Sequence, residues 1–329
     1  IRRRIHLGVG DSPVLSRMDL VLLCPGQGSQ KPGMAKDLAA AFPAAAQVLS
    51  RVNDALGFDL SAMMFEGPEA ELTKTLNAQP ALLAHSAAVW AVIGPAVGAR
   101  VKAAAGHSLG EFTAYHATGA IGLEAASRLV RTRGQLMYAA GEARAGAMAA
   151  VLGDLQEPIE LICEKASATA GLVVPANYNS PGQIVISGEV PGVELAMTLA
   201  KAAGAKKCIK LNVSGAFHSP LMEPAMDGLR QALGQAGIQD AKVPVVSNVN
   251  AAPTRWQPSI LHLLLRQLTM PVRWTDVVAR LAAQHPQALF VEMGTGSVLS
   301  GLVRKIAPAV KTATCGTPAD VESLLAQVA

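Results

Sequence analysis

A serine flanked by glycines is the first group in this sequence that could do chemistry. The stretch Gly106-His107-Ser108-Leu109-Gly110-Glu111 has the spacing G-x-S-x-G. It follows a short apolar run at residues 101–105 and precedes a stretch at 111–118 that can be helical. This strand–turn–helix context is typical of a nucleophile elbow, which lifts a serine hydroxyl clear of a sheet. The pattern also fits a plain structural turn in an alanine- and glycine-rich chain.

A serine hydroxyl needs a base near neutral pH, and histidine is the usual one. His218 lies on a loop, directly after the strand that we predict to end an inserted unit. The junction of two units is a place where a base is needed, although ordinary loop contacts can also hold a histidine there. The remaining histidines lack such a context: His107 would point away across the turn, and no motif surrounds His85, His116, His262 or His285.

A carboxylate between Ser108 and His218 would complete a Ser-His-Asp arrangement in the chain order of the hydrolases. None of the available acids follows a predicted strand in the place of an orienting acid. A backbone carbonyl can hold the histidine tautomer instead. The acids considered are Glu111, Glu124, Asp154 and Glu189.

A glycine-rich loop follows the first predicted strand. Residues 20–23 read as a buried strand that runs into Pro25-Gly26-Gln27-Gly28-Ser29-Gln30, and a helix is expected at about residues 33–40. In α/β folds such a loop faces a ligand. It is neither a Walker A motif nor G-x-G-x-x-G, and it fits a tight turn as well as a loop that presents backbone N–H groups.

The element order changes between residues 146 and 213. We predict strands at 147–152, 172–176, 183–187 and 207–213 and helices at 157–170 and 190–203, with a turn around 179–182. This βαββαβ order is the ferredoxin-like split motif. Elsewhere we predict helices at 43–56, 69–76, 79–93, 122–141, 224–236, 259–268, 274–284, up to 306 and from 318, and strands at 243–247, 288–292 and 310–313.

These elements predict an α/β fold of two domains. Residues 18–144 and 214–329 would form a large domain with a mainly parallel sheet, and residues 145–213 would form the inserted domain. Residues 1–17 begin with the basic stretch Ile1-Arg2-Arg3-Arg4. We expect them to be a leader or an appended segment outside the fold.

The composition narrows the function classes. Hydrophobic residues make up 50% and charged residues 16%, so we expect a sizeable core rather than disorder. A net charge of +4 with few aromatic residues argues against nucleic acid, while it suits anionic ligands. Four scattered cysteines indicate reduced thiols in a cytoplasmic protein rather than a zinc site. The apolar stretch 81–99 predicts a buried helix ending near Ile93 rather than a membrane span.

Several stretches together resemble the malonyl-CoA:acyl-carrier-protein transacylases. The resemblance covers nearly everything from about residue 20 to 306 in the order of the family, and six ordered motifs are more specific than one elbow. Besides the two glycine-rich stretches, they are Arg131-Thr132-Arg133-Gly134, Asn177-Tyr178-Asn179-Ser180-Pro181-Gly182-Gln183, Gly215-Ala216-Phe217-His218-Ser219, and Arg266-Gln267-Leu268 with Pro271-Val272-Arg273-Trp274.

The resemblance implies an α/β-hydrolase-like large domain with a ferredoxin-like insertion, in agreement with the element order. It also implies that a malonyl group moves from coenzyme A to a serine and then to the phosphopantetheine thiol of acyl carrier protein, in fatty-acid biosynthesis. The coenzyme A thioester is then a substrate, and neither a permanently bound cofactor nor a metal is expected. The expected partners are malonyl-CoA and holo acyl carrier protein, for a monomeric enzyme that binds neither nucleic acid nor a membrane.

The resemblance assigns roles to matching residues. Ser108 would be the nucleophile, and His218 the general base and acid. The backbone N–H groups of Gln27 and Leu109 would form an oxyanion hole. Arg133 would pair with the malonyl carboxylate, since a guanidinium binds a carboxylate bidentately and a buried carboxylate needs a partner.

Further residues are assigned in the same way. Gln267 would orient His218 through its backbone carbonyl, in place of a triad acid. Asn177 and Asn179 would lie near the substrate. Phe217 and Leu109 match the malonyl-selecting form, because a bulky ring leaves little space for a 2-methyl group.

The sequence departs from the family pattern at two places. Cys24 replaces the usual aromatic residue, and Gly294-Thr295-Gly296-Ser297 replaces a more usual Gly-Pro-Gly-Lys.

Several other functions remain as alternatives. A malonyl-loading acyltransferase of polyketide assembly, or the malonyl-transfer subunit of malonate decarboxylase, would carry the same residues. Arg133 and the missing triad acid disfavour a serine thioesterase or hydrolase. The Ser108 and His218 pair disfavours a non-catalytic carrier-protein-binding module.

Overall fold

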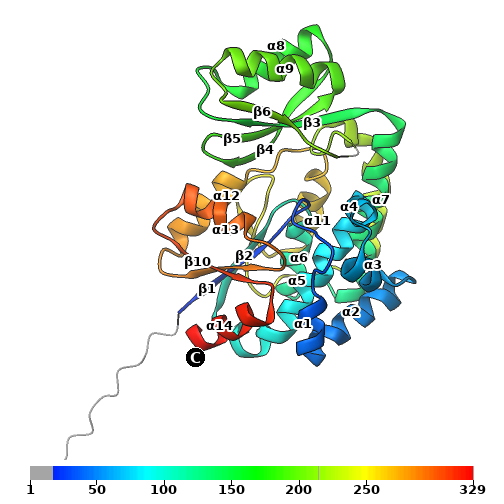
Figure 1. Ribbon diagram of the computed structural model, residues 1–329, viewed down its shortest axis with the longest axis vertical. Coiled ribbons are helices and arrows are strands. Elements are labelled where there is room, and N and C mark those ends of the chain that lie inside the picture. The colour runs from blue at the N-terminus through cyan, green and yellow to red at the C-terminus, as the bar shows by residue number, and fades with distance from the viewer. Residues whose placement is uncertain (1–17, 214, 329) are drawn as a thin grey trace, which may run out of the picture.

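The computed structural model describes residues 18–213 and 215–328 (Figure 1). The predicted leader at residues 1–17 lies outside the described residues. Within them, the chain forms two sheets, each with its own helices. Both the α/β class and the insertion of a small antiparallel sheet into a larger, mainly parallel one are confirmed.

The larger sheet has the strand order β10-β9-β1-β2-β7-β8. All neighbouring pairs from β10 to β7 are parallel, and the short β8 runs antiparallel to β7. The carboxyl ends of the central parallel strands therefore meet at one edge. The strands are β1 (Leu20–Cys24), β2 (Val101–Gly106), β7 (Val245–Val246), β8 (Pro253–Thr254), β9 (Leu289–Met293) and β10 (Lys311–Cys315).

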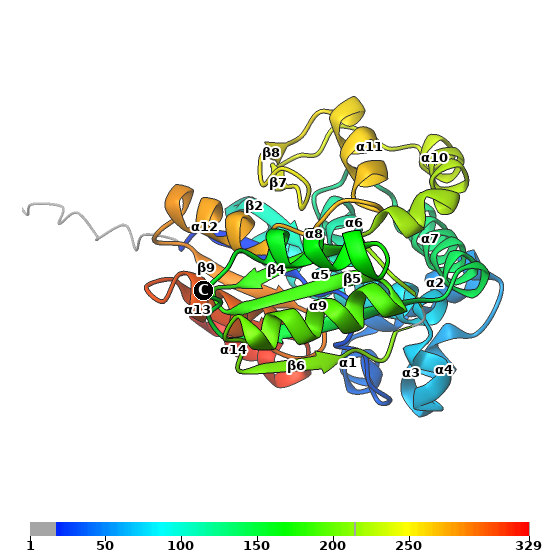
Figure 2. The ribbon, with the colours of Figure 1, turned by 90° about the horizontal axis from the view of Figure 1, so that it is seen from above.

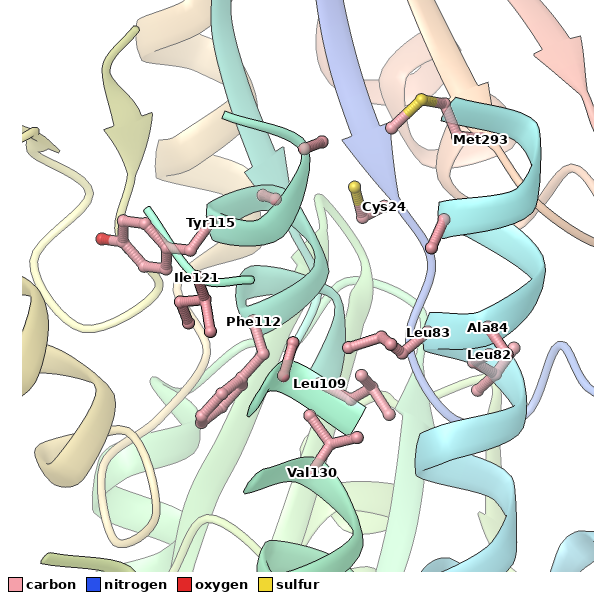
Figure 3. Packing of buried hydrophobic residues seen from close by; sticks show 14 of the residues in the cluster. Cys24, Leu82, Leu83, Ala84, Leu109, Phe112, Tyr115, Ile121, Val130 and Met293 are labelled. Carbon is pink, nitrogen blue, oxygen red and sulfur yellow. The ribbon is translucent and has the colours of Figure 1, made fainter. Parts of the chain in front are cut away.

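Helices cover both faces of the larger sheet, because the side chains of a strand alternate between its faces. Leu22 and Cys24 of β1 pack with Leu83 of α5 (Thr75–Val97) and Leu109 of α6 (Leu109–Ala117), in the layer shown in Figure 3. Val21 and Leu23 pack instead against α12 (Trp274–Gln284) and α13 (Val298–Ile306). The other helices here are α1 (Lys36–Ala41), α2 (Pro43–Leu56), α3 (Leu60–Glu66), α4 (Glu69–Thr73), η1 (Gly98–Arg100), α7 (Leu123–Ala143), η2 (Pro220–Ala225), α10 (Met226–Gln235), α11 (Gln257–Arg266) and α14 (Pro318–Val328).

The smaller sheet has the antiparallel order β4-β5-β3-β6, which confirms the predicted βαββαβ unit. Helices α8 and α9 cover one face of it, and the other face is turned toward the larger sheet (Figures 1 and 2). We propose residues 145–213 as an inserted unit and 18–144 with 214–329 as the large unit. The elements are β3 (Gly146–Leu152), α8 (Ile159–Thr169), β4 (Val173–Ser180), β5 (Gln183–Glu189), α9 (Val190–Ala202) and β6 (Lys207–Lys210).

The segment between α2 and β2 departs most from the sequence prediction. The helix predicted at 69–76 ends at Thr73, and the one predicted at 79–93 extends over Thr75–Val97, through Pro80 and Pro95. Every side chain from Asn77 to Val89 is buried, so tertiary packing outweighs the cost of proline inside a helix. The helix α3, which the prediction missed, begins where the Asp59 carboxylate accepts a hydrogen bond from the Ala62 N–H.

Length and composition would allow the helical stretch Thr75–Arg100 to cross a membrane. Its first half is enclosed by the other helices of the large unit, as expected for the central helix of a globular core. The predicted burial is therefore confirmed for residues 81–89, whereas the predicted end near Ile93 is wrong, since the helix continues to Val97 and exposes Pro95 and Ala96.

A strand end in the inserted unit also differs from prediction. The expected turn around residues 179–182 is shorter, because β4 continues to Ser180. Backbone bonds between the two units hold this extension: Tyr178 N–H donates to Val272 O at 2.9 Å, and Val272 N–H donates to Ala176 O at 2.8 Å. Asn177 and Asn179 thus lie on a strand that is fastened to the large unit.

Candidate active site

Ser108 lies where β2 ends and α6 begins, at the edge where the carboxyl ends of the parallel strands meet. A cavity of about 380 Å³ opens there between the large and the inserted unit. Clefts between domains and at this edge of a sheet are frequent ligand sites. Residues lining the cavity include Gln27, Ser108, Arg133, Met148, Asn177 and His218.

The backbone at Ser108 has the geometry of a nucleophile elbow, with φ 52° and ψ −109°. The two flanking glycines are required by close packing. A Cβ on Gly106 would lie 1.9 Å from the Gly110 carbonyl oxygen, and a Cβ on Gly110 would lie 2.0 Å from the Cys24 carbonyl oxygen. Since real Cβ atoms do not approach that closely, G-x-S-x-G is a steric requirement of this turn.

His218 is in hydrogen-bond contact with the serine. The Ser108 hydroxyl and His218 Nε2 are 2.7 Å apart, and His218 Nδ1–H donates to the Gln267 carbonyl oxygen at 2.9 Å. This second bond leaves Nε2 as the acceptor. Burial, and then the positive charge of Arg133, lower the pKa of His218 to about 3, so the ring is neutral at neutral pH and Nε2 has a free lone pair.

Arg133 of α7 is buried directly beside the serine. Its Nη2 donates to Ser108 Oγ at 3.2 Å and to Gln267 Oε1 at 3.0 Å, and its Nη1 donates to Gln79 Oε1 at 2.7 Å. Burial lowers the pKa of Arg133 to about 10, which leaves the guanidinium charged at neutral pH. A fixed cation at the nucleophile suits an acyl group that carries a negative charge.

Gln27 and Leu109 both line the same cavity. In the described part of the chain, the backbone N–H of neither residue donates to a protein acceptor. The Gln27 loop is held against the start of α5, because the Thr75 hydroxyl donates to Gln27 Oε1 at 2.8 Å. Paired, pre-placed N–H donors can stabilise an oxyanion on a thioester carbon.

The two asparagines occupy different places. Asn177 lines the cavity, as does Phe217. Asn179 Oδ1 instead accepts a hydrogen bond at 2.8 Å from Nε2 of His107, whose ring lies against Trp274 at 5.5 Å. His107 also lines the cavity, and its ring is engaged by Asn179 and Trp274.

Sequence reasoning missed several residues around the serine. Asn248 Oδ1 accepts from the Ser108 N–H at 2.7 Å, and its Nδ2 donates to the Gly106 carbonyl at 2.8 Å. Gln79 accepts a hydrogen bond from Arg133. Gln267 contributes its side chain as well as its backbone carbonyl, since its Nε2 donates to the Ser108 carbonyl. The one available signal was the position of Asn248, which follows a short buried strand at the carboxyl edge of the sheet.

No group of three or more His, Cys, Asp or Glu side chains that could hold a metal occurs among the described residues. All four cysteines are free. His85 and His116 bond the backbone carbonyls of Gly316 and Ile121, at 2.9 and 3.0 Å.

The sequence and the fold both match known proteins. A family model described as "Acyl transferase domain" matches residues 21–317. The chain is 45% identical over 303 residues to the malonyl CoA-acyl carrier protein transacylase of Bacillus subtilis (strain 168), covering 92% of this chain and 95% of that protein. It is 41% identical over 301 residues to the protein of the same name from Escherichia coli (strain K12), covering 92% and 97%.

Two solved structures are similar throughout. The acyl-carrier-protein-S-malonyltransferase of Bartonella henselae has a TM-score of 0.90 at 42% identity, covering 94% of this chain and 99% of that chain. A malonyl-transacylase in complex with its type II polyketide synthase acyl-carrier protein has a TM-score of 0.89 at 41% identity, with the same coverage.

Proposed function

The chain belongs to the acyl transferase family, and from this premise we propose that it transfers malonyl from malonyl-CoA to the phosphopantetheine thiol of acyl carrier protein through a malonyl-serine intermediate. This is the reaction named for its relatives, in fatty-acid synthesis. One observation carries the proposal: the buried Arg133 guanidinium lies 3.2 Å from Ser108 Oγ. Such a cation favours a carboxylate-bearing acyl group over an uncharged one.

The first half of the reaction begins with His218. Its neutral Nε2 takes the Ser108 proton while Oγ attacks the thioester carbon. The N–H groups of Gln27 and Leu109 stabilise the oxyanion, and Arg133 pairs with the malonyl carboxylate. When the tetrahedral intermediate collapses, the C–S bond breaks, and the proton on Nε2 passes to the coenzyme A sulfur.

The second half reverses these roles. The phosphopantetheine thiol gives its proton to His218 Nε2, and its sulfur attacks the malonyl-serine ester. Collapse breaks the bond to Oγ, which regains the proton from His218. Gln267 holds Nδ1 throughout, since its carbonyl accepts at 2.9 Å.

Several finer statements belong to the same proposal. The coenzyme A thioester is a substrate, and no step of this mechanism uses a metal or another cofactor. Phe217 on the cavity wall favours malonyl over methylmalonyl groups. We propose a monomer located in the cytoplasm, in keeping with four free cysteines.

Competition between acyl-CoAs tests the proposal. The protein is incubated with equal amounts of malonyl-, methylmalonyl- and acetyl-CoA, and the acyl-enzyme is analysed by intact and peptide mass spectrometry. We expect a malonyl adduct on the peptide that contains Ser108, and no adduct on Ser108→Ala. An adduct that persists in Ser108→Ala would refute the nucleophile, and an acetyl adduct as abundant as malonyl would refute the substrate.

The same acyl-enzyme distinguishes transfer from hydrolysis and fatty-acid from polyketide use. It is chased with water, with a fatty-acid holo carrier protein, or with a polyketide carrier protein. Faster loss to the fatty-acid carrier supports the proposal. If the malonyl-enzyme loses its acyl group to water as fast as to the carrier proteins, the protein is a hydrolase.

A further inference from the structure

Glu111 is a fully buried carboxylate three residues after the serine, in the first turn of α6. The reaction described above gives it no role. Its Oε2 accepts two hydrogen bonds, from Gln267 Nε2 at 2.7 Å and from the Asn248 N–H at 3.1 Å. Both donors belong to residues that contact the reacting groups.

Gln267 links Glu111 to the three central residues of the site, which are Ser108, Arg133 and His218. Gln267 Nε2 also donates to the Ser108 carbonyl at 2.9 Å, and its Oε1 accepts from Arg133 at 3.0 Å. Its backbone carbonyl accepts from His218 Nδ1. The bond to Glu111 therefore sets the side-chain amide on which the contacts with Ser108 and Arg133 depend, in the same residue whose backbone carbonyl holds His218.

Through Asn248, Glu111 also supports the backbone of the elbow. The Asn248 N–H donates to Glu111. The side chain of Asn248 accepts a hydrogen bond from the Ser108 N–H and donates one to the Gly106 carbonyl. Ser108 has a positive φ, which an L-residue keeps only where surrounding contacts over-determine it.

We propose that Glu111 is a positioning residue for the acyl transfer, acting on His218 and Arg133 through Gln267 and on Ser108 through Asn248. Glu111 thus takes the place of the missing triad acid, but it acts on His218 through Gln267 and not by a direct hydrogen bond. The inference rests on the proposed function, because it assumes that Ser108 is acylated. Glu111 itself touches neither substrate nor reacting atoms.

The charge of Glu111 strengthens these contacts. An ionised carboxylate makes stronger hydrogen bonds than a neutral one, and it favours the imidazolium that forms on His218. Burial raises the pKa of Glu111 to about 7, despite opposing bonds from Gln267 and Asn248. The carboxylate therefore becomes protonated as the pH falls through about 7, and the positioning weakens.

No other titratable group near the serine is expected to change charge at a pH of about 7. The titratable groups that face Glu111 are Arg133 of α7 and Tyr115 of α6. The other groups that face it are the Ser247 hydroxyl and the Asn248 N–H after β7, and the side-chain amide of Gln267 after α11. Burial raises the pKa of Tyr115 and leaves Arg133 charged. Burial also lowers the pKa values of His218 and of the nearby His107 below the usual 6.5.

The substitution Glu111→Gln separates charge from shape, because glutamine keeps an acceptor oxygen. The single-turnover rate of Ser108 malonylation is measured from pH 5.5 to 8.5. At pH 8 we expect a roughly tenfold loss with little change in KM, since a charged acceptor is replaced by a neutral one. Below about pH 6 the two rates should converge, because Glu111 is then protonated in the unsubstituted protein too. A ratio that does not vary with pH would overturn the inference.

Glu292→Gln is the matched control. Glu292 is also fully buried, and its oxygens accept from the Leu299 and Ser300 N–H groups at the start of α13. We expect a lower melting temperature for this variant and a pH-rate profile like that of the unsubstituted protein. An equal change in the pH profile of both variants would mean that any buried carboxylate has this effect, which would contradict a special role for Glu111.

The unsubstituted protein provides a test that does not depend on the folding of a variant. Its rate should rise as the pH increases through about 7, and a flat profile between pH 6 and 8 would overturn the inference. The two proposals fail differently. Absence of any malonyl-serine in the unsubstituted protein refutes the proposed function, whereas normal acylation without this pH dependence refutes the role of Glu111 alone.

Discussion

The large unit and the inserted unit meet at the same cavity, but they contribute different kinds of side chains. From the large unit come Ser108, His218 and Arg133, bonded to one another and to amides behind them. From the inserted unit come Met148 on the wall, Asn177, and Asn179 acting through His107.

This difference follows from the two sheets. In the parallel sheet, strand ends deliver loops and helix starts to one edge, so groups distant in sequence converge there. The antiparallel sheet turns a face toward that edge and offers single side chains from strands (Figures 1 and 2). Substitutions in the large unit should therefore impair the chemistry, and those in the inserted unit should mainly alter the fit of the substrate.

The largest effect after the loss of the serine itself is expected from Arg133→Ala. Truncating one partner of a buried charged pair costs about 2–5 kcal/mol, or roughly 30- to 5,000-fold in malonyl transfer. Acetyl-CoA should be affected much less, because it has no carboxylate. Steady-state kinetics with both substrates check this. In the control Arg131→Ala, the lost contacts are with Leu76, Asn77 and the Phe58 ring, outside the cavity, and malonyl selectivity should be kept.

A smaller effect is expected from Asn248→Ala. The substitution leaves the Ser108 N–H and the Gly106 carbonyl without their partner, at about 1–3 kcal/mol for a buried unsatisfied group. Turnover should fall roughly 5- to 150-fold with little change in KM, in stopped-flow measurements of acylation. Asn250→Ala is the control, since Asn250 is exposed and caps only the Ala252 N–H. Equal losses in the two variants would contradict the role of Asn248.

The smallest effect should come from the inserted unit, with Asn179→Ala. One hydrogen bond to His107 is lost, worth about 1 kcal/mol, and Trp274 still packs against the ring. We expect a loss of about fivefold, mostly in KM for malonyl-CoA. Tyr178→Phe serves as control, because its hydroxyl bonds Glu160 on the outer side. A loss in kcat as large as for Asn248→Ala would break the distinction between the two units.

Much of the fold was predictable where local pattern and tertiary burial agree. The bounds of α2 and α12 match the predicted 43–56 and 274–284, and α14 begins at Pro318 as predicted, with the Thr317 hydroxyl accepting from the Asp320 N–H. The predicted bounds failed at α4 and α5, because packing keeps α5 helical through Pro80 and Pro95. They also failed at β4, whose last residues depend on backbone bonds to Val272, almost a hundred positions away in the sequence.

By itself, the sequence determined the elbow at Ser108, the order of elements and the family, because turn sterics and residue periodicity are local properties. Only the tertiary structure decided which side chains support that serine. Glu111 belongs to the same helix as the elbow, but its partners Asn248 and Gln267 follow elements more than 130 residues later. Hydrogen bonds depend on distances of about 3 Å and on angles. Those distances exist only once the parallel strands have brought their ends together.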